Sequence, residues 1–344
     1  IREVFIMNNI KLVSIDLAKN VFQVCGINQA GKPIVNKKVK RSQLLETVLS
    51  LKPKRIVMEA CYTANYWGRK FQSFQFEVSA IPAQFVKAFV RGNKNDGNDA
   101  LAIAEAAVRP NMRFVPIKTI EQQDLQTRHR VRERHIRNRT ALINQIRGIL
   151  SEYGVTIALG SKTVIKQIPL VLEDANNELS PSARSLLSDL SQELRTITET
   201  IKHDEVIIEQ LSKSHDTYQR LMTVPGIGKI LSSFIIASVG NGQQFKNGRE
   251  FSAWIGLTPR QYASGDKSYL GKVSKRGNRT LRTLFIHGAR AAFTRCKQRD
   301  HYLFQWSEKI AARSSKPKAW VALANKLARI VWAMLVKKTE FQYR

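Results

Sequence analysis

The order of strand-like and helix-like segments in the first 116 residues constrains the fold of this chain most strongly. Three strand-like segments come first, at Lys11–Asp16, Val21–Ile27 and Ile34–Val39, and a polar turn at Gln29–Lys32 separates the second from the third. Helix-like and strand-like segments then alternate as far as Val108. This order predicts an α/β domain at the start of the chain.

The alternating part contains three predicted helices and two predicted strands. In chain order they are expected at Ser42–Leu51, Arg55–Glu59, Ala64–Gln72, Phe76–Ile81 and Asp99–Val108. A Gly- and Asn-rich loop, Gly92–Asn98, precedes the last helix. Three consecutive strands followed by alternating helices and strands is the order of the RNase H-like fold, which we therefore predict here.

A long helix is predicted for the middle of the chain. From Glu121 to Tyr153 there is no proline and only one glycine, so the stretch is compatible with one continuous helix. Its second half is apolar on one side, whereas Arg128–Arg139 holds six Arg and two His against one Glu. We expect this basic half to bind nucleic acid. The arginines concerned are Arg128, Arg130, Arg132, Arg134, Arg137 and Arg139.

A second amphipathic helix follows the Gly160 and Pro169 region. Its apolar residues keep a three-four spacing, interrupted once by Asp204: Leu187, Leu190, Leu194, Ile197, Ile201, Ile208 and Leu211. Such a heptad seam predicts a coiled coil with a partner helix. The alternative is one amphipathic helix packed on its own domain. Because residues 155–216 are net acidic, we expect this arm to contact protein and not DNA.

The charge of the chain indicates its partner. Lys and Arg number 56 and Asp and Glu 27, which gives a net charge of +29. So large a surplus repels itself unless a polyanion neutralises it, so we expect a nucleic acid. The three cysteines form no CxxC pair, and no stretch resembles a signal peptide or a membrane span. We expect a cytoplasmic protein that binds no membrane.

Four acidic residues of the α/β part are candidate metal ligands. Asp16 lies in the first strand, and Glu59 ends the strand Arg55–Glu59. In an RNase H-like sheet these two strands are neighbours. Asp96 and Asp99 are three residues apart at the start of a helix, so they fall on one helix face, and this helix packs across the two strands.

Four carboxylates gathered in one cleft repel each other unless cations lie between them. Oxygen ligands favour a hard ion, Mg²⁺ or Mn²⁺, and a pair of such ions can promote attack at a phosphodiester. The alternative is that Asp96 and Asp99 only cap a helix, and that Glu59 is a solvated strand end. The order and spacing of all four favour the metal site.

The segment Val224–Lys229, Val-Pro-Gly-Ile-Gly-Lys, separates two helical stretches and is similar to a helix-hairpin-helix turn. Without a Cβ, Gly226 and Gly228 let backbone N–H groups approach a phosphate, and Lys229 adds charge. The alternative is a plain turn between two helices.

A Ser-Gly pair at Ser264 lies in what we expect to be a polar loop rich in cations. A serine hydroxyl becomes a good nucleophile only when it is positioned and deprotonated near positive charge or metal. The alternative is that Ser264 is a turn residue of a DNA-binding loop. The surrounding cations, which we expect to bind phosphates, are Arg260, Lys267, Lys272, Lys275, Arg276 and Arg279.

At these residues the chain resembles the DEDD insertion-sequence transposases, the group that includes the Piv-type DNA invertases. The resemblance extends over nearly the whole chain. The N-terminal segments that carry it are Ile15-Asp-Leu-Ala-Lys, Met58-Glu-Ala and Asp96-Gly-Asn-Asp-Ala. The C-terminal segments are Pro225-Gly-Ile-Gly, Gly256-Leu-Thr-Pro, Ser264-Gly and Ser274-Lys-Arg-Gly-Asn-Arg-Thr-Leu-Arg.

The resemblance implies a RuvC-like domain at residues 7–116, a coiled-coil arm at 117–216 and a mostly helical transposase domain at 217–344. It implies that Asp16, Glu59, Asp96 and Asp99 are catalytic metal ligands and that Ser264 forms a phosphoserine link to DNA. It also implies a prokaryotic protein guided by a non-coding RNA that pairs with target and donor DNA. We further expect a homo-oligomer, a dimer or a tetramer on DNA.

Other functions remain open at this point. Ser268 is close enough to Ser264 in sequence to be a rival nucleophile. A RuvC-like structure-specific endonuclease, in which water attacks, would explain the carboxylates and the charge but leaves the Ser-Gly segment unused. A non-catalytic DNA- or RNA-binding protein with a decayed site is a third class, and the presence of all four carboxylates speaks against it.

Overall fold

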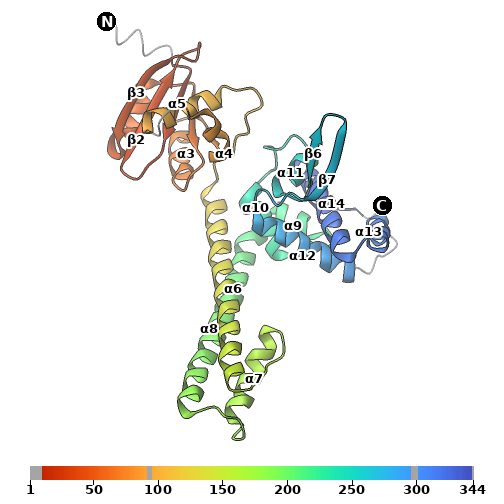
Figure 1. The fold of residues 1–344 in the computed structure, drawn as a ribbon. Helices are drawn as coiled ribbons and strands as arrows, with labels where there is room; N and C mark the ends of the chain where they lie inside the picture. Colours follow the sequence, from red (N-terminus) through yellow and green to blue (C-terminus); the bar gives the residue numbers. More distant parts are fainter. Residues whose placement is uncertain (1–9, 91–94, 296–300, 343–344) are drawn as a thin grey trace. The chain divides into compact units, whose positions relative to one another are not determined.

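The computed structural model describes residues 10–90, 95–295 and 301–342. The chain divides into two compact units, residues 1–120 and 121–344 (Figure 1). Residues 7–9 of the first predicted domain lie outside the described residues. The second unit contains the predicted arm from residue 121 onward and the predicted C-terminal domain, whereas residues 117–120 of the arm belong to the first unit.

A five-stranded mixed sheet forms the centre of the first unit, in the order β3-β2-β1-β4-β5. Pairing is antiparallel between β1 and β2 and between β2 and β3, and parallel between β1 and β4 and between β4 and β5. The predicted strands are confirmed, and the sheet is consistent with an RNase H-like fold. The strands are β1 (Leu12–Asp16), β2 (Val21–Ile27), β3 (Pro33–Lys40), β4 (Arg55–Glu59) and β5 (Glu77–Ile81).

Helices cover both faces of this sheet (Figure 1). On one face, α2 (Leu44–Leu51) and α3 (Ala64–Gln72) pack on buried strand residues such as Ile15 and Met58. On the other face, α5 (Asp96–Ala107) packs its alanines on Leu12 and Val57. Because successive strand residues point to opposite faces, the sheet separates two apolar clusters. The short helices are η1 (Arg41–Gln43), α4 (Ala83–Val86) and η2 (Lys87–Phe89).

Helix α5 begins three residues before the predicted start at Asp99. The side chain of Asn95 accepts a hydrogen bond from the Asn98 N–H at 2.8 Å, so Asn95 is the N-cap. Asparagine is among the strongest N-cap residues, and its cap places both Asp96 and Asp99 inside the helix. The capping role considered for these two aspartates therefore belongs to Asn95.

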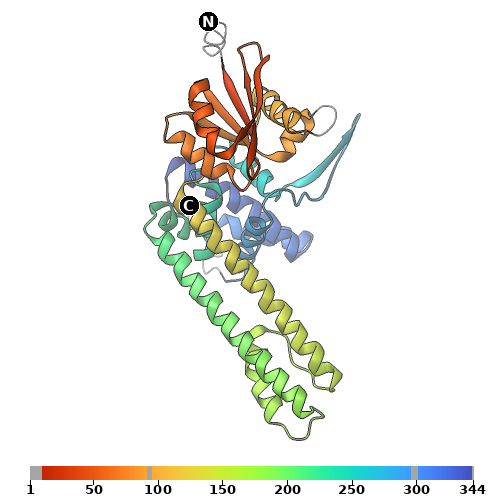
Figure 2. The ribbon, with the colours of Figure 1, turned by 90° about the vertical axis from the view of Figure 1, so that its left-hand side faces the viewer.

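The second unit begins with two long helices, α6 (Ile120–Glu152) and α8 (Pro181–Lys213), which run antiparallel and side by side (Figures 1 and 2). The apolar half of α6, α7 (Ser161–Glu173) and the start of α8 share one core. Leu187 and Leu194 are fully buried there. The helix that covers the heptad seam is thus α6 of the same chain. This agrees with the alternative in which the amphipathic helix packs within its own domain.

Six further helices surround the main core of the second unit. The longest, α14, has the length and apolar composition of a membrane span, but its buried residues, including Leu327 and Val331, pack in this core against α11, α12 and α13. A buried core helix can have the same length and apolar composition as a helix that spans a membrane. The six are α9 (Asp216–Met222), α10 (Lys229–Val239), α11 (Gly248–Ile255), α12 (Arg279–Arg295), α13 (Tyr302–Arg313) and α14 (Lys316–Lys337).

The Ser-Gly segment forms a β-hairpin, where the sequence led us to expect a loop. Strands β6 (Pro259–Ser264) and β7 (Lys267–Val273) pair antiparallel, and the hairpin extends away from the helices of its unit (Figure 2). Gly265, with φ +55°, and Asp266 form a two-residue turn. A Gly-Asp pair between β-forming residues is a hairpin signal, because the glycine adopts positive φ without strain.

Candidate active site

Two of the four predicted carboxylates lie at neighbouring strand ends. Ile15 of β1 pairs in parallel with Met58 of β4, and the next residue on each strand is Asp16 or Glu59. Both strands end at these acids, which are half-buried. Alternation along the strand places Asp16 with Ser14, and Glu59 with Val57, on the face covered by α5. The sheet therefore brings these two carboxylates to one edge and one face.

The helix that carries Asp96 and Asp99 is tied to the same sheet by hydrogen bonds. The hydroxyl of buried Ser14 donates to the Ala100 carbonyl at 2.6 Å. On the next strands, Gln23 Nε2 donates to Asn36 Oδ1 at 2.7 Å, and Asn36 Nδ2 donates to the Gly97 carbonyl at 3.2 Å. The first turn of α5 is thus held over β1, β2 and β3.

The two aspartates of that turn differ in their surroundings. Asp96 is exposed, and its carboxylate pairs with Lys38 of β3 at 3.2 Å. Asp99 is half-buried. Within the described residues, no three Asp, Glu, His or Cys side chains are close enough to share one metal ion. The backbone therefore brings the acid-bearing elements together, but Asp96 would have to leave Lys38 to join a shared site.

The chemistry of this edge fits a hard divalent cation. All four predicted ligands are carboxylates, which Mg²⁺ and Mn²⁺ prefer. Gln23 is the register partner of Asp16, and its Oε1 atom is buried without a hydrogen-bond partner among the groups the structure describes. A buried oxygen acceptor of this kind calls for a cation or a water molecule beside it. Gln23 and Asn36 were missed from the sequence, because neither belongs to an acidic motif.

The predicted nucleophile, Ser264, is exposed at the tip of the β6–β7 hairpin. Its register partner is Lys267, so the hydroxyl and an ammonium group lie on the same face of the hairpin. Ser268 pairs with Ala263, one residue further along, and therefore lies on the opposite face. The two candidate serines thus lie on opposite faces of the hairpin.

The root of the hairpin is tightly packed, in contrast to its tip. Gly256, with φ +81°, lies so close to Arg276 that a Cβ would overlap the Arg276 carbonyl oxygen. Buried Arg282 of α12 donates from Nη1 to the carbonyls of Ile255 and Arg276, each at 2.8 Å. Arg282 was not predicted, since a single Arg in a basic segment gives no signal of burial.

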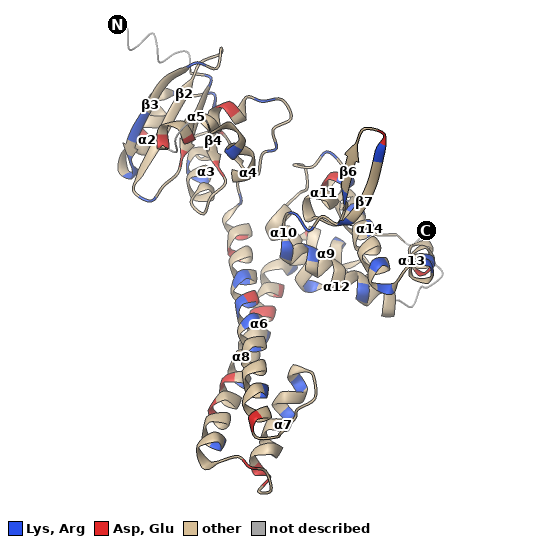
Figure 3. Cartoon of the chain, viewed as in Figure 1, with Lys and Arg blue, Asp and Glu red and all other residues tan. Residues whose placement is uncertain are grey.

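All six predicted cations of the hairpin, the loop after it and the first residue of α12 are exposed. No ion pair joins any of them to a carboxylate within the part of the chain that the structure describes. Their charge is therefore available to a polyanion (Figure 3). They are Arg260, Lys267, Lys272, Lys275, Arg276 and Arg279.

The predicted cations of α6 are divided between two environments. Arg132 binds Glu205 of α8 through Nε at 3.0 Å, and Arg128 lies 3.6 Å from buried Asp204. His135 Nδ1 is also 3.0 Å from Asp204. Arg139 is half-buried, whereas the exposed arginines without an acidic partner among the described residues are Arg130, Arg134 and Arg137.

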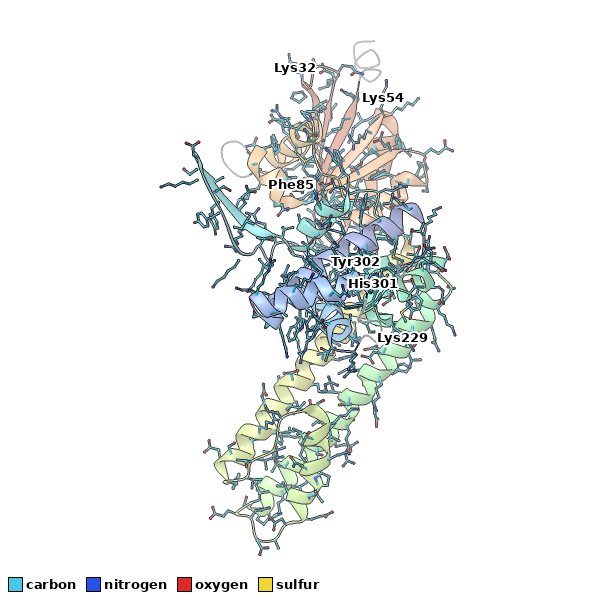
Figure 4. All side chains as sticks on the ribbon, turned by 90° about the vertical axis from the view of Figure 1, so that its right-hand side faces the viewer. Lys32, Lys54, Phe85, Lys229, His301 and Tyr302 are labelled. Carbon is cyan, nitrogen blue, oxygen red and sulfur yellow. The ribbon has the colours of Figure 1, made fainter. Side chains whose placement is uncertain are left out.

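The Val224–Lys229 turn joins α9 to α10 and packs closely against α12. Gly226, with φ +82°, lies against Gly288, and a Cβ on Gly226 would overlap the Gly288 carbonyl. This contact accounts for Gly226 as a packing residue, in agreement with the alternative of a plain interhelical turn. Lys229 (Figure 4) pairs with Glu209 of α8 at 2.7 Å, whereas Gly228 borders open space.

Comparison with known proteins finds two family profiles along the chain. The profile of the DEDD transposases of the IS110 type matches residues 13–155, and that described as "Transposase IS116/IS110/IS902 family" matches residues 218–305. The first covers the four carboxylates, and the second covers the hairpin with Ser264.

Individual proteins match over most of their length. The transposase for insertion sequence element IS1111A of Coxiella burnetii is 45% identical over 336 residues, 98% of this chain and 92% of that protein. The transposase for insertion sequence element IS1328 of Yersinia enterocolitica is 37% identical, with 97% and 99% covered. A pilin gene-inverting protein of Moraxella bovis is 22% identical, with 96% and 98% covered.

Proposed function

Because the chain belongs to the IS116/IS110/IS902 family of DEDD transposases, we propose that it recombines DNA through a covalent bond to Ser264. The family makes it an insertion-sequence transposase. The observation that carries the serine step is the position of Ser264, exposed at a hairpin tip opposite Lys267 and among cations that have no acidic partner within the described residues. A phosphate held by these cations is exposed to attack by the hydroxyl.

The proposed chemistry consists of two transesterifications. The Ser264 oxygen loses its proton and bonds to phosphorus, while the bond from phosphorus to one deoxyribose oxygen breaks and that oxygen takes a proton. A hydroxyl of the second DNA strand then attacks the phosphoserine, which forms a new phosphodiester and restores the serine. Each step exchanges one phosphoester bond for another, so no external energy source is needed.

The carboxylates supply the second part of the proposal. A Mg²⁺ or Mn²⁺ ion held by Asp16, Glu59 and Asp99, joined by Asp96 once it leaves Lys38, would stabilise negative charge on the phosphate during transfer. The chain's own contribution is positional. Ser14 and Asn36 hold the first turn of α5 to the sheet, and this fixes the backbone positions of Asp96 and Asp99.

We extend the proposal to a non-coding guide RNA and to a homo-oligomer, a dimer or a tetramer on DNA. The RNA rests on the family resemblance and on a net charge of +29, which suits two polyanions. The buried heptad seam no longer supports the oligomer, because Leu187 and Leu194 are covered by the same chain. Contacts between copies would therefore use other surfaces.

Mass spectrometry of a trapped reaction tests this function. The full-length protein, its donor and target DNA and its RNA are incubated with Mn²⁺ and quenched, and peptides are searched for a nucleotide adduct. We expect the adduct on Ser264, its loss in Ser264→Ala and its retention in Ser268→Ala. An adduct on Ser268 would move the nucleophile to the other hairpin face. Cleavage without any adduct would show a RuvC-like endonuclease that uses water.

A further inference from the structure

Two tyrosines form an exposed stack on the hairpin. Tyr262 and Tyr269 are register partners, and their rings are stacked with centroids 4.9 Å apart at an interplanar angle of 14°. The residues are 44% and 64% exposed, so neither belongs to a core. Large aromatic side chains that a fold leaves in solvent on a projecting element mark a contact surface.

The stack lies on the same face as Ser264. Ser264 pairs with Lys267, and Tyr262 pairs with Tyr269 two residues further from the tip on each strand. Because side chains alternate, all four point to one face. Two residues of strand span roughly 7 Å, so the rings lie within one nucleotide's reach of the serine.

Gly271 provides the room for this stack. A Cβ at Gly271 would lie 2.9 Å from Cε2 of Tyr262, tighter than real contacts, although the backbone there is not in the left-handed region. A side chain at position 271 would therefore make the ring of Tyr262 move from its present position. Tyr262 lies against Gly271 and against Tyr269, and Tyr269 is the more exposed of the two rings.

The charge around the stack selects the kind of partner. The hairpin carries three exposed cations, Arg260, Lys267 and Lys272, against one acid, Asp266. A flat aromatic surface beside exposed cations suits a nucleotide, whose base stacks while its phosphate binds the cations. In Figure 4 the side chains of this hairpin stand clear of the helices of their own unit.

We infer that the Tyr262–Tyr269 stack is a platform for one unpaired base of the DNA strand that Ser264 cuts. Stacking of that base would draw the neighbouring phosphate to the hairpin tip and favour strands that are already unpaired at the cut. The inference rests on the proposed function for the identity of the strand. The stacking itself is tested without any cleavage.

The test uses the full-length protein and a short single-stranded DNA that carries 2-aminopurine, whose fluorescence falls when its ring stacks. Affinity and quenching are measured at one salt concentration for the wild type, Tyr269→Leu and Tyr269→Phe. We expect Tyr269→Leu to lose the quenching and to bind about 5- to 150-fold more weakly, the loss of one base stack. Tyr269→Phe should keep both.

Two further variants serve as controls. Leu270→Ala removes an equally exposed side chain, 69% exposed, from the opposite face and should change neither quenching nor affinity. Gly271→Ala keeps both rings but crowds Tyr262, and should reduce quenching. If Tyr269→Leu quenches and binds like the wild type, the platform is refuted.

Competing partners and the proposed function are separated by further measurements. Stronger tyrosine-dependent quenching of an RNA oligonucleotide of the same sequence would overturn the assignment to DNA. Dissociation of an oligomer by Tyr269→Leu in light scattering, with quenching unchanged, would assign the stack to a second copy of this chain. Ser264→Ala should retain full quenching. If no adduct forms on Ser264 but the tyrosine-dependent quenching remains, the proposed function is refuted and the base-stacking platform is retained.

Discussion

Helix α6 and the β6–β7 hairpin carry two of the cation-rich segments of this chain, and the fold uses them differently. In α6, Arg128 and Arg132 lie against Asp204 and Glu205 of α8, and the apolar second half of the helix is packed in a core. In the hairpin, every cation is exposed, and within the described residues none has an acidic partner. A run of cations thus indicates charge, but its acidic neighbours in the fold decide how much of that charge a nucleic acid meets.

The comparison predicts that substitutions in α6 and α8 change stability and that substitutions in the hairpin change binding. The largest effect is expected from Leu194→Asp, because Leu194 is fully buried between helices of one chain. The lost apolar contacts and the buried charge should cost at least about 4 kcal/mol of unfolding free energy.

Thermal and denaturant unfolding of Leu194→Asp at low protein concentration measure this cost. Leu186→Asp is the matched control, since Leu186 lies on the same helix and is 48% exposed, and it should change stability by less than about 1 kcal/mol. Equal stability of both variants, with a change only in oligomer size, would restore the seam as an interface between chains.

His129 of α6, which is buried against α10, gives the next largest expected effect. Burial, reinforced by the charge of Arg132, lowers the pKa of His129 from 6.5 to about 3, and its Nε2 lies 2.8 Å from Ser233 Oγ. A lowered folded-state pKa means that the unfolded chain binds more protons between about pH 6.5 and 3. The stability contribution is therefore complete above pH 6.5 and is lost as the pH falls, by about 3 kcal/mol at pH 4.

Unfolding curves of wild type and His129→Gln between pH 7 and pH 4 isolate this histidine, because all other titrating groups are common to both. The wild type should lose about 3 kcal/mol more than the variant over that range. Parallel curves would show that His129 is protonated in the folded state.

The exposed cations of the hairpin are expected to set the salt dependence of DNA binding. Replacing Arg260, Lys267 and Lys272 together by Gln should lower the slope of log affinity against log salt by roughly 2 to 3 and weaken DNA binding by about 10- to 100-fold at 0.1 M salt. Unfolding should be unchanged, since all three are exposed. An unchanged salt slope in fluorescence anisotropy would remove the hairpin from the DNA-binding surface.

The smallest effect is expected from Arg132→Gln, which breaks the pair with Glu205. This partly exposed pair should contribute about 1 kcal/mol or less, and the salt slope of DNA binding should remain as in the wild type. Arg130→Gln is the control on the same helix, because Arg130 is exposed, and it should lower the slope by about 1. Equal salt slopes of DNA binding for the two variants would show that α8 neutralises no part of the basic segment Arg128–Arg139.

The predictions from sequence succeeded where a local pattern specifies the structure. The strand-like segments predicted all five strands of the sheet, and the parallel pairing of β1 with β4 places Asp16 and Glu59 at one edge. The hairpin was missed, although Gly265-Asp266 between Tyr262 and Tyr269 carries its signal, because the density of cations suggested a loop. The start of α5 was placed too late because the cap residue, Asn95, lies in a polar run.

Residue types and their spacing therefore determined by themselves the charge and the order of elements, since these depend on neighbours in the chain. They also made the four acids and Ser264 candidates for the site, and the roles of these residues stay predictions. Only the tertiary structure decided which cations are neutralised, that Gly226 packs on Gly288, and that Lys38 pairs with Asp96. It also set the Gln23–Asn36–Gly97 hydrogen bonds, which join residues up to 61 positions apart. Such contacts depend on which strands and helices become neighbours, and no periodicity within one segment encodes that.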